Sequence, residues 1–303
     1  MESAISLNAL VKTFGEHRAV DGLSFEVPQG SVFGLLGRNG AGKSTTLRMI
    51  MDIIRPDSGE VRVLGRTMEN GLKDRIGYLP EERGLYPKMK VQEMLEFQGT
   101  LKGLQIAESR TRASRWLDRL ELGAWKTKKV QELSKGMQQK VQFAAALIGE
   151  PELVILDEPF SGMDPLNQDL FKDLLLEVSR GGTTIILSTH VMESAERLCQ
   201  EIALIEQGKA VLNGALPMIK RAFGSNAVQM EFDGDASFLR QLPIVDTIDD
   251  YGQYLEINLN KGADPQQILQ AALGKLQIRR FELVLPTLHN IFIQQVGQEA
   301  ADV

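Results

Sequence analysis

Two spacings of apolar residues alternate along positions 1–215. Apolar runs of strand length at 31–36 (SVFGLL), 152–158 (ELVILDE) and 183–189 (TTIILST) are each followed by a stretch with apolar residues three or four positions apart. A short apolar run is typical of a buried strand, and the longer period is typical of a helix. The alternation predicts an α/β domain whose mainly parallel sheet is covered on both faces.

The other elements expected in this part follow from the same two patterns. Strands with alternating or apolar residues are expected at 6–11, 23–27, 57–65, 75–80 and 201–208. Helices are expected at 43–54, 91–104, 108–122, 133–150, 164–180 and 191–200. Ser134 stands where the helix at 133–150 needs a residue whose side chain accepts from the first free N–H groups, so it is the expected N-cap.

The pattern changes after Leu216. The remaining residues read as strand, helix, two strands, helix, strand and a last helix, at 227–232, 236–242, 245–252, 253–260, 265–276, 279–285 and 287–297. That order suits a small α+β domain of ferredoxin-like topology. We therefore assign 1–218 to the first domain and 222–303 to the second.

The bulk composition limits the possible partners. The chain has 303 residues, of which 43% are hydrophobic and 24% charged, with a formal net charge of −6. This acidic balance argues against a general nucleic-acid binder, so no nucleic-acid partner is expected. The single cysteine, Cys199, allows no disulfide within one chain and is expected to be a small buried apolar residue.

Nothing in the sequence predicts a segment that crosses a membrane. Residues 1–17 lack a basic region followed by an apolar run, so no signal peptide is expected. No apolar stretch reaches the length of about 20 residues that a spanning helix needs. The chain is expected to lie on a membrane only through a partner.

A phosphate-binding motif lies between the strand at 31–36 and the helix that begins at 43. Residues 37–44 (GRNGAGKS) match G-x-x-x-x-G-K-[ST]. Glycines let the loop's N–H groups approach phosphates, and the helix that follows adds the positive end of its dipole. Lys43 would bring its charge to the β- and γ-phosphates of ATP, and the Ser44 hydroxyl would ligate Mg²⁺. The expected nucleotide-binding residues are Gly37, Arg38, Asn39, Gly40, Ala41, Gly42, Lys43, Ser44 and Thr45.

Two carboxylates end the apolar run at 152–158. Beside a phosphate loop, Asp157 would be the second holder of Mg²⁺, and Glu158 would orient and deprotonate the attacking water. Two solvated carboxylates at a strand end are the alternative. His190, which follows the strand at 183–189, could reach a γ-phosphate, whereas His17 and His289 are read as structural.

These residues, with the segment 133–140 (LSKGMQQK), resemble the ABC ATPase family. The segment is similar to the family's signature motif, usually Leu-Ser-Gly-Gly-Gln, and it precedes Asp157 at the expected interval. Asp164 then resembles the D-loop aspartate and His190 the switch histidine. Phe14 resembles the aromatic residue that stacks on adenine, although the sequence alone equally allows a core aromatic.

The resemblance covers residues 4–215 and implies a fold, an activity and partners. It implies a P-loop ABC ATPase core, with a mainly parallel sheet, an antiparallel β subdomain and a helical subdomain. It further implies a head-to-tail homodimer in which Ser134 and Gly136 of one copy cap an ATP held by the other. The subunits would power an integral-membrane permease and lie peripherally on the cytoplasmic face of the cell membrane. The permease would dock near residues 81–90.

Two departures from the family pattern bear on the chemistry. Glu81 stands where the family usually has the Q-loop glutamine, and Lys135 and Met137 replace a signature glycine and glutamine. A carboxylate at 81 can still accept from a metal-bound water, so Glu81 stays among the expected catalytic and metal-site residues. These departures, and residues 286–293 (PTLHNIFI), resemble a subgroup of two-component exporters of sodium or antibiotics. The sequence does not specify the cargo.

Other functions explain less of the sequence. A soluble ABC ATPase acting on DNA or the ribosome typically carries long coiled-coil insertions or two cassettes, and this chain has one compact cassette. A P-loop kinase or GTPase leaves the signature segment unexplained. The segment 108–122 carries four arginines, Arg110, Arg112, Arg115 and Arg119. They fit either contact with a partner or lipid headgroups or a solvated helical face, and the solvated face is the simpler interpretation.

Overall fold

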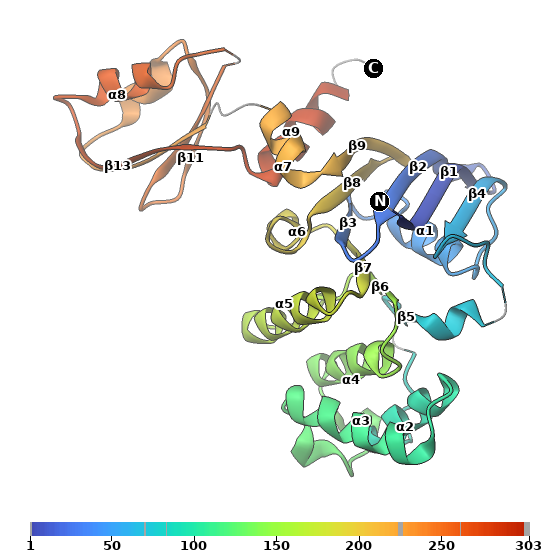
Figure 1. Cartoon of the computed structure of the whole chain (residues 1–303). Helices are drawn as coiled ribbons and strands as arrows, with labels where there is room; N and C mark the ends of the chain where they lie inside the picture. Colours follow the sequence, from blue (N-terminus) through green and yellow to red (C-terminus); the bar gives the residue numbers. More distant parts are fainter. Residues whose placement is uncertain (1, 70, 83, 224–226, 261, 300–303) are drawn as a thin grey trace. The chain divides into compact units, whose positions relative to one another are not determined.

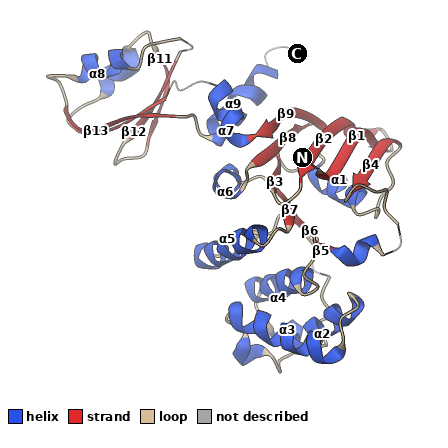
Figure 2. Ribbon diagram, viewed as in Figure 1, coloured by secondary structure: helices blue, strands red, loops and turns tan. Residues whose placement is uncertain are grey.

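The chain forms two compact units, Met1–Gly214 and Ala215–Val303. The computed structural model describes residues 2–69, 71–82, 84–223, 227–260 and 262–299, and Figures 1 and 2 show their secondary structure. The division falls just before helix α7 (Leu216–Ala222), which was not expected from the sequence and lies across the boundary expected between 218 and 222.

A six-stranded sheet forms the centre of the first unit. Its strand order is β5-β6-β7-β3-β8-β9, and the neighbours from β5 to β8 are all parallel. The strands are β5 (Ile76–Leu79), β6 (Leu153–Asp157), β7 (Thr184–Thr189), β3 (Val32–Leu36), β8 (Glu201–Glu206) and β9 (Lys209–Ala215). Every residue of β3, β6 and β7 is buried, which confirms the mainly parallel, doubly covered sheet.

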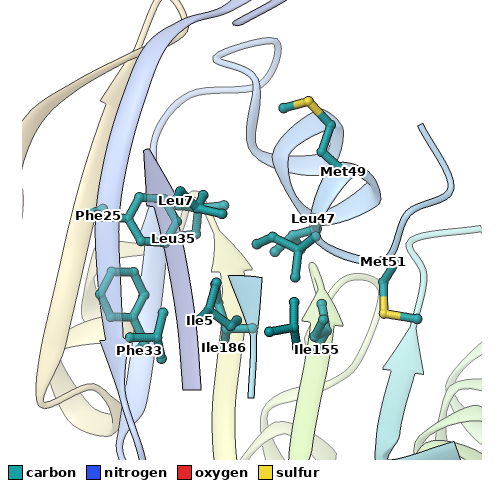
Figure 3. Close-up of a cluster of buried hydrophobic side chains, with 14 of the residues drawn as sticks. Ile5, Leu7, Phe25, Phe33, Leu35, Leu47, Met49, Met51, Ile155 and Ile186 are labelled. Atoms are coloured by element: carbon teal, nitrogen blue, oxygen red, sulfur yellow. The ribbon is translucent and has the colours of Figure 1, made fainter. Parts of the chain in front are cut away.

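A second sheet in this unit is antiparallel, and its apolar side chains pack against those of the parallel sheet. Its order is β2-β1-β4, from β2 (His17–Pro28), β1 (Ser3–Phe14) and β4 (Ser58–Val63). Figure 3 shows side chains of β1 and β2 meeting those of β3 and of helix α1 (Lys43–Ile50) in one apolar cluster. Within it the rings of Phe25 and Phe33 stack with centroids 5.1 Å apart. This cluster fixes α1, and therefore the loop before it, against the parallel sheet.

The remaining helices cover the sheet and form a separate helical group. Helices α5 (Pro165–Arg180) and α6 (Met192–Leu198) lie on the side of the parallel sheet away from α1 (Figure 1). Helices α2 (Val91–Leu101), α3 (Ile106–Arg119) and α4 (Lys135–Leu147) pack on one another, and short 3₁₀ turns occur at Leu72–Arg75, Gly123–Trp125 and Val130–Glu132. In the parts of the chain that the structure describes, no helix is both long enough and apolar enough to span a bilayer.

Helix α1 ends earlier than the expected 43–54. Asp52 adopts the left-handed conformation, with φ of 51°, and the N–H groups of Ile53 and Ile54 both donate to the carbonyl of Arg48. These bonds close the last turn in the manner of a Schellman cap. The helical spacing of apolar residues continues past this cap to Ile54, so the helix predicted from the sequence is longer than α1.

The second unit has the ferredoxin-like strand order. Its antiparallel sheet runs β11-β12-β10-β13, that is, second, third, first and fourth strand of the unit. The strands are β10 (Ala227–Asp233), β11 (Val245–Asp250), β12 (Leu255–Leu259) and β13 (Gln277–Val284), with helices α8 (Gln266–Ala272) and α9 (Leu288–Glu299). The expected helix at 236–242 is a 3₁₀ turn, Ser237–Gln241. Its Leu239 is nevertheless fully buried in the unit's apolar cluster, so packing and not helical length holds the segment.

Glycine is required at one contact between α4 and the sheet. A Cβ built on Gly77 in β5 would lie 2.1 Å from the carbonyl oxygen of Ala146 in α4. A backbone atom cannot yield as a side chain does, so the helix would have to move. We predict that Gly77→Ala lowers the free energy of unfolding by about 1–3 kcal/mol, the usual cost of overpacking. Both tryptophans, Trp116 and Trp125, belong to the first unit, so their fluorescence in a urea titration reports it alone.

Gly84→Ala is the matched control for that measurement. No atom of the described residues lies within 4 Å of a Cβ built there. Its effect should stay within about 0.5 kcal/mol. Equal urea midpoints for Gly77→Ala and the wild type would contradict the packing described for α4.

The structure confirms the prediction that the single cysteine, Cys199, is a buried residue. Cys199 is buried, and burial raises the pKa of its thiol to about 12. At pH 8 about one thiol in ten thousand would then be ionised, and only the thiolate reacts. We predict no labelling of the native chain by a disulfide reagent and one equivalent after denaturation in urea. Rapid labelling in native buffer would show that the segment around Cys199 is open.

Candidate functional site

The candidate residues gather at one edge of the parallel sheet because each follows the carboxyl end of a strand. The loop 37–42 follows β3, and Glu81 follows β5. Asp157 ends β6, Glu158 comes directly after it, and His190 follows β7. Parallel strands bring these ends to a single edge, which is where ligands bind in open α/β sheets.

Two glycines let the 37–42 loop lie close to its neighbours. Gly37 has φ of 149° and Gly42 has φ of 107°, values that residues with a Cβ rarely adopt. A Cβ at Gly37 would lie 2.2 Å from the carbonyl oxygen of Ile205, and one at Gly42 would lie 2.3 Å from that of Ala19. The loop is therefore packed against β8 and β2 through bare backbone, and α1 starts directly after it with Lys43.

Lys43 is a buried cation with three oxygen partners. Its Nζ donates to the carbonyl oxygens of Gly37 at 2.9 Å and Arg38 at 3.2 Å. It also lies 3.4 Å from Glu158 Oε1. A buried charge must be paired or it is strongly unfavourable, so these contacts hold the ammonium group inside the loop.

Asp157 combines complete burial with one unused oxygen. The residue is 0% exposed, and its Oδ1 accepts from the hydroxyl of Ser44 at 3.0 Å. Its Oδ2 has no hydrogen-bond partner among the described residues. An orphaned buried carboxylate oxygen next to a serine hydroxyl is a hard-oxygen donor pair that suits Mg²⁺.

The described residues would not hold a metal without help. No group of three or more His, Cys, Asp or Glu side chains in the described part of the chain is placed to bind one. Mg²⁺ is usually held by one or two protein oxygens together with substrate phosphates. The Ser44–Asp157 pair fits a Mg²⁺ ion that arrives with a nucleotide.

Glu158 contacts two of the other predicted site residues, His190 and Lys43. Its Oε1 lies 2.9 Å from His190 Nδ1 and 3.4 Å from Lys43 Nζ. Its own N–H donates to the hydroxyl of Ser188 at 2.9 Å, and its φ is 47°. The carboxylate is therefore held by a cation and an imidazole, and is not the solvated strand end that the alternative interpretation required.

A cavity of about 470 Å³ opens in front of these groups. The residues that line it are Phe14, His17, Ala19, Asn39, Gly40, Gly42, Lys43, Ser44, Thr45, Glu81 and Glu158. Arg38 and Ala41 line a neighbouring hollow that shares Asn39 and Gly40. The structure thus places nine of the twelve predicted nucleotide-binding residues around two adjoining spaces.

Phe14 and His17 lie at this cavity and not in the core. Phe14 is 47% exposed, so the alternative of a core aromatic is wrong. His17 was read as structural, but it is exposed and lines the cavity. The two residues stand opposite each other at the ends of the β1–β2 hairpin, where Phe14 pairs with His17. Only the hairpin pairing brings His17 to the cavity, and no local motif around it signals this.

Five predicted residues do not line these spaces. Gly37, Asp157 and His190 lie behind or beside residues that do, whereas Ser134 and Gly136 belong to the start of α4. Ser134 is the N-cap of α4, as expected, and its Oγ accepts from the N–H of Met137 at 3.3 Å. Helix α4 does reach the site's loops by another route that the sequence did not indicate. Gln142 donates through Nε2 to the carbonyl oxygens of Pro80 at 3.0 Å and Glu82 at 3.2 Å, on either side of Glu81.

The arginines of α3 are engaged mainly with glutamates of the same unit. Arg110 pairs with Glu96 at 3.3 Å and Arg112 with Glu108 at 2.6 Å, and Arg119 pairs with Glu177. Arg110 is 67% exposed, whereas Arg112 and Arg119 are only 22% and 24% exposed, so this face is ion-paired and only partly solvated.

Comparison with known proteins finds matches over both units. Residues 20–161 match the family described as ABC transporter, and residues 214–296 match the C-terminal domain of DrrA1-3-like ATP-binding proteins. The chain is 42% identical to the uncharacterized ABC transporter ATP-binding protein YhaQ of Bacillus subtilis, over 97% of this chain and 98% of that protein. It is 34% identical to the Nod factor export ATP-binding protein I of Paraburkholderia xenovorans, over 99% of each. A solved dimeric ATP-binding cassette in a post-hydrolysis state, with bound ADP and Pi, has a TM-score of 0.64 at 25% identity and covers 70% of this chain and 98% of its own.

Proposed function

Because the chain belongs to the ABC transporter family of ATP-binding proteins, we propose that the site at the carboxyl edge of its parallel sheet binds ATP with Mg²⁺. Hydrolysis at this site would power export through a separate membrane permease. Membership of the family makes the chain an ATP-binding subunit and an ATPase. The observation that supports the proposed site best is the convergence of Lys43, Ser44, Asp157 and Glu158 from two strand ends.

The 37–42 loop and Lys43 would hold the triphosphate. Loop N–H groups and the start of α1 present positive partial charge to phosphate oxygens. The γ-phosphate would replace Glu158 as a partner of the Lys43 ammonium group, which now lies 3.4 Å from that carboxylate. Phosphate binding would then free Glu158 from its cation.

Ser44 and Asp157 would hold Mg²⁺, and Glu81 would accept from one of its waters. Bound there, the ion would neutralise charge that develops on the phosphates. The Ser44 hydroxyl can keep donating to Asp157 Oδ1 while a lone pair of its oxygen binds the metal. Asp157 Oδ2, which has no partner among the described residues, can accept from a metal-bound water.

Glu158 would orient and deprotonate the attacking water. A carboxylate released from Lys43 can accept a proton, and Glu158 lines the cavity in which that water would lie. His190, with Nδ1 at 2.9 Å from Glu158 Oε1, would hold that carboxylate in place and reach toward the γ-phosphate with its other ring nitrogen, Nε2.

A second copy would complete the site. Ser134 caps α4 with an exposed hydroxyl and the helix's free N–H groups, which suit a γ-phosphate, yet it does not line the cavity of its own chain. Gly136 leaves open space beside it, since no atom of the described residues lies within 4 Å of a Cβ built there. These features support the head-to-tail homodimer, and the similar ATP-binding cassette with ADP and Pi is dimeric.

Export through a permease is the direction we favour. A relative that matches along 99% of the chain is named for export of Nod factor, and the second unit matches a domain of DrrA-like proteins. The permease would dock on the segment 81–90, of which residue 83 lies outside the described residues. We place the assembly peripherally on the cytoplasmic face of the cell membrane.

The test is Glu158→Gln, which keeps the shape of the side chain and removes the base. We predict unchanged ATP affinity, a fall in phosphate release of at least about a hundredfold, and a stable ATP-bound dimer, because binding and chemistry use different groups. Fluorescent-nucleotide titration, a phosphate-release assay and light scattering measure the three quantities.

Lys43→Ala and Glu60→Gln complete this experiment. Lys43→Ala should lose most of the ATP affinity, whereas Glu60→Gln changes an exposed glutamate of β4 and should behave as the wild type. Phosphate release by Glu158→Gln near the wild-type rate would remove Glu158 from the role of base.

A further inference from the structure

Ser188 is a buried polar residue that the proposed function leaves without a role. It lies in the central strand β7 and is 0% exposed. The parallel register places it directly opposite Asp157 of β6. A polar side chain buried in this way must find partners inside the protein.

Its hydroxyl is used in both directions. Ser188 Oγ donates to Asp157 Oδ1 at 2.5 Å and accepts from the N–H of Glu158 at 2.9 Å. A serine hydroxyl has one proton to donate, and here it goes to a carboxylate, which gives a strong charge-assisted bond. One side chain therefore touches both acidic residues of the site.

The bond to Asp157 determines which carboxylate oxygen stays free. Oδ1 receives two hydroxyl protons, from Ser188 and from Ser44 at 3.0 Å. These two donors fix the plane of the carboxylate, and Oδ2 is left buried without a partner among the described residues. Without Ser188 the carboxylate of Asp157 could rotate, and Oδ2 would no longer be the oxygen that is left without a partner.

The bond to Glu158 steadies an unusual backbone conformation. Glu158 has φ of 47°, in the left-handed region that residues other than glycine seldom adopt. Such a conformation persists when the surrounding structure holds it, and it is common at active sites. The Ser188 hydroxyl accepts the amide at this turn, and the side chain then points to His190 at 2.9 Å.

We propose that Ser188 is a positioning residue that couples the metal holder Asp157 to the base Glu158 through one hydroxyl. The inference rests on the proposed function, because it assigns Ser188 to the same Mg²⁺-ATP site. A purely structural hydroxyl would stabilise β7 without distinguishing nucleotide with Mg²⁺ from nucleotide without it. A positioning hydroxyl affects only the states in which Asp157 and Glu158 act.

The experiment compares Ser188→Ala with the wild type at two levels. Binding of a fluorescent ATP analogue is measured in EDTA and across a Mg²⁺ titration, and ATP hydrolysis is measured to give kcat and KM. We expect unchanged affinity in EDTA, a Mg²⁺ half-saturation about tenfold higher, and kcat about ten- to a hundredfold lower, the range for losing a hydrogen bond to a charged group. KM for ATP should stay within about threefold, since phosphate binding uses the 37–42 loop and Lys43.

Two further variants keep the result decisive. Ser188→Cys preserves the approximate volume with a weaker donor and should fall between Ala and Ser, and it carries the test alone if the alanine variant does not fold. Thr184→Val is the matched control, because it removes another buried hydroxyl of β7, one that accepts from the N–H of Gly30 at 2.9 Å, far from the carboxylates. It should show wild-type values of kcat and Mg²⁺ half-saturation.

The outcomes separate the inference from the function beneath it. Wild-type Mg²⁺ half-saturation and kcat in the folded Ser188 variants, or equal losses in Thr184→Val, would overturn the role of Ser188 while the ATPase stands. A wild-type chain whose ATP binding gains nothing from Mg²⁺ would instead overturn the proposed site itself.

Discussion

The hydrogen bond between Ser44 and Asp157 joins two segments that lie 113 residues apart in the chain, and the site depends on it. Ser44 belongs to the first turn of α1, directly after the glycine loop, and Asp157 is the last residue of β6. Strand β7 lies between β3 and β6, so the two residues meet only because all three strands are parallel and in register. The apolar cluster under α1 holds the loop at the height where this bond forms. The geometry of the site therefore depends directly on the register of the parallel sheet.

Burial makes the charges of this edge interdependent. Asp157 is fully buried and Lys43 nearly so, and a buried ion that loses its partner costs far more than the pair contributes. Each charge is accordingly held by several groups. Lys43 contacts carbonyls of its own loop and Glu158 of the segment after β6, and Asp157 accepts from hydroxyls of α1 and β7. An anionic ligand that takes over Lys43 changes the surroundings of Glu158 in the same step. Anion binding at the loop would in this way change the partners of Glu158, the base proposed above.

The sequence predicted the parts that local patterns encode. The runs at 31–36, 152–158 and 183–189 are buried strands because continuous apolar residues fit only a sheet covered on both faces, and the 37–44 motif lies where strand meets helix. What the sequence could not supply depends on register and on tertiary contacts. Ser188 looked like any polar residue near a strand end until its pairing with Asp157 was known. The same holds for His17, which hairpin pairing brings beside Phe14, and for the Schellman closure that ends α1 after Ile50. Helix α7 was missed since its seven residues give only a short apolar pattern, and the expected domain boundary was drawn through it.

The central claim is that Ser44 and Asp157 form half of a metal site whose other half is the nucleotide. Electron paramagnetic resonance of Mn²⁺, used in place of Mg²⁺, counts bound ions directly. With a non-hydrolysable ATP analogue the wild-type chain should bind one Mn²⁺ per nucleotide, it should bind none tightly without the analogue, and Asp157→Asn should lose the ion while still binding the analogue in EDTA. Tight Mn²⁺ binding in the absence of nucleotide, or full binding by Asp157→Asn, would contradict the account.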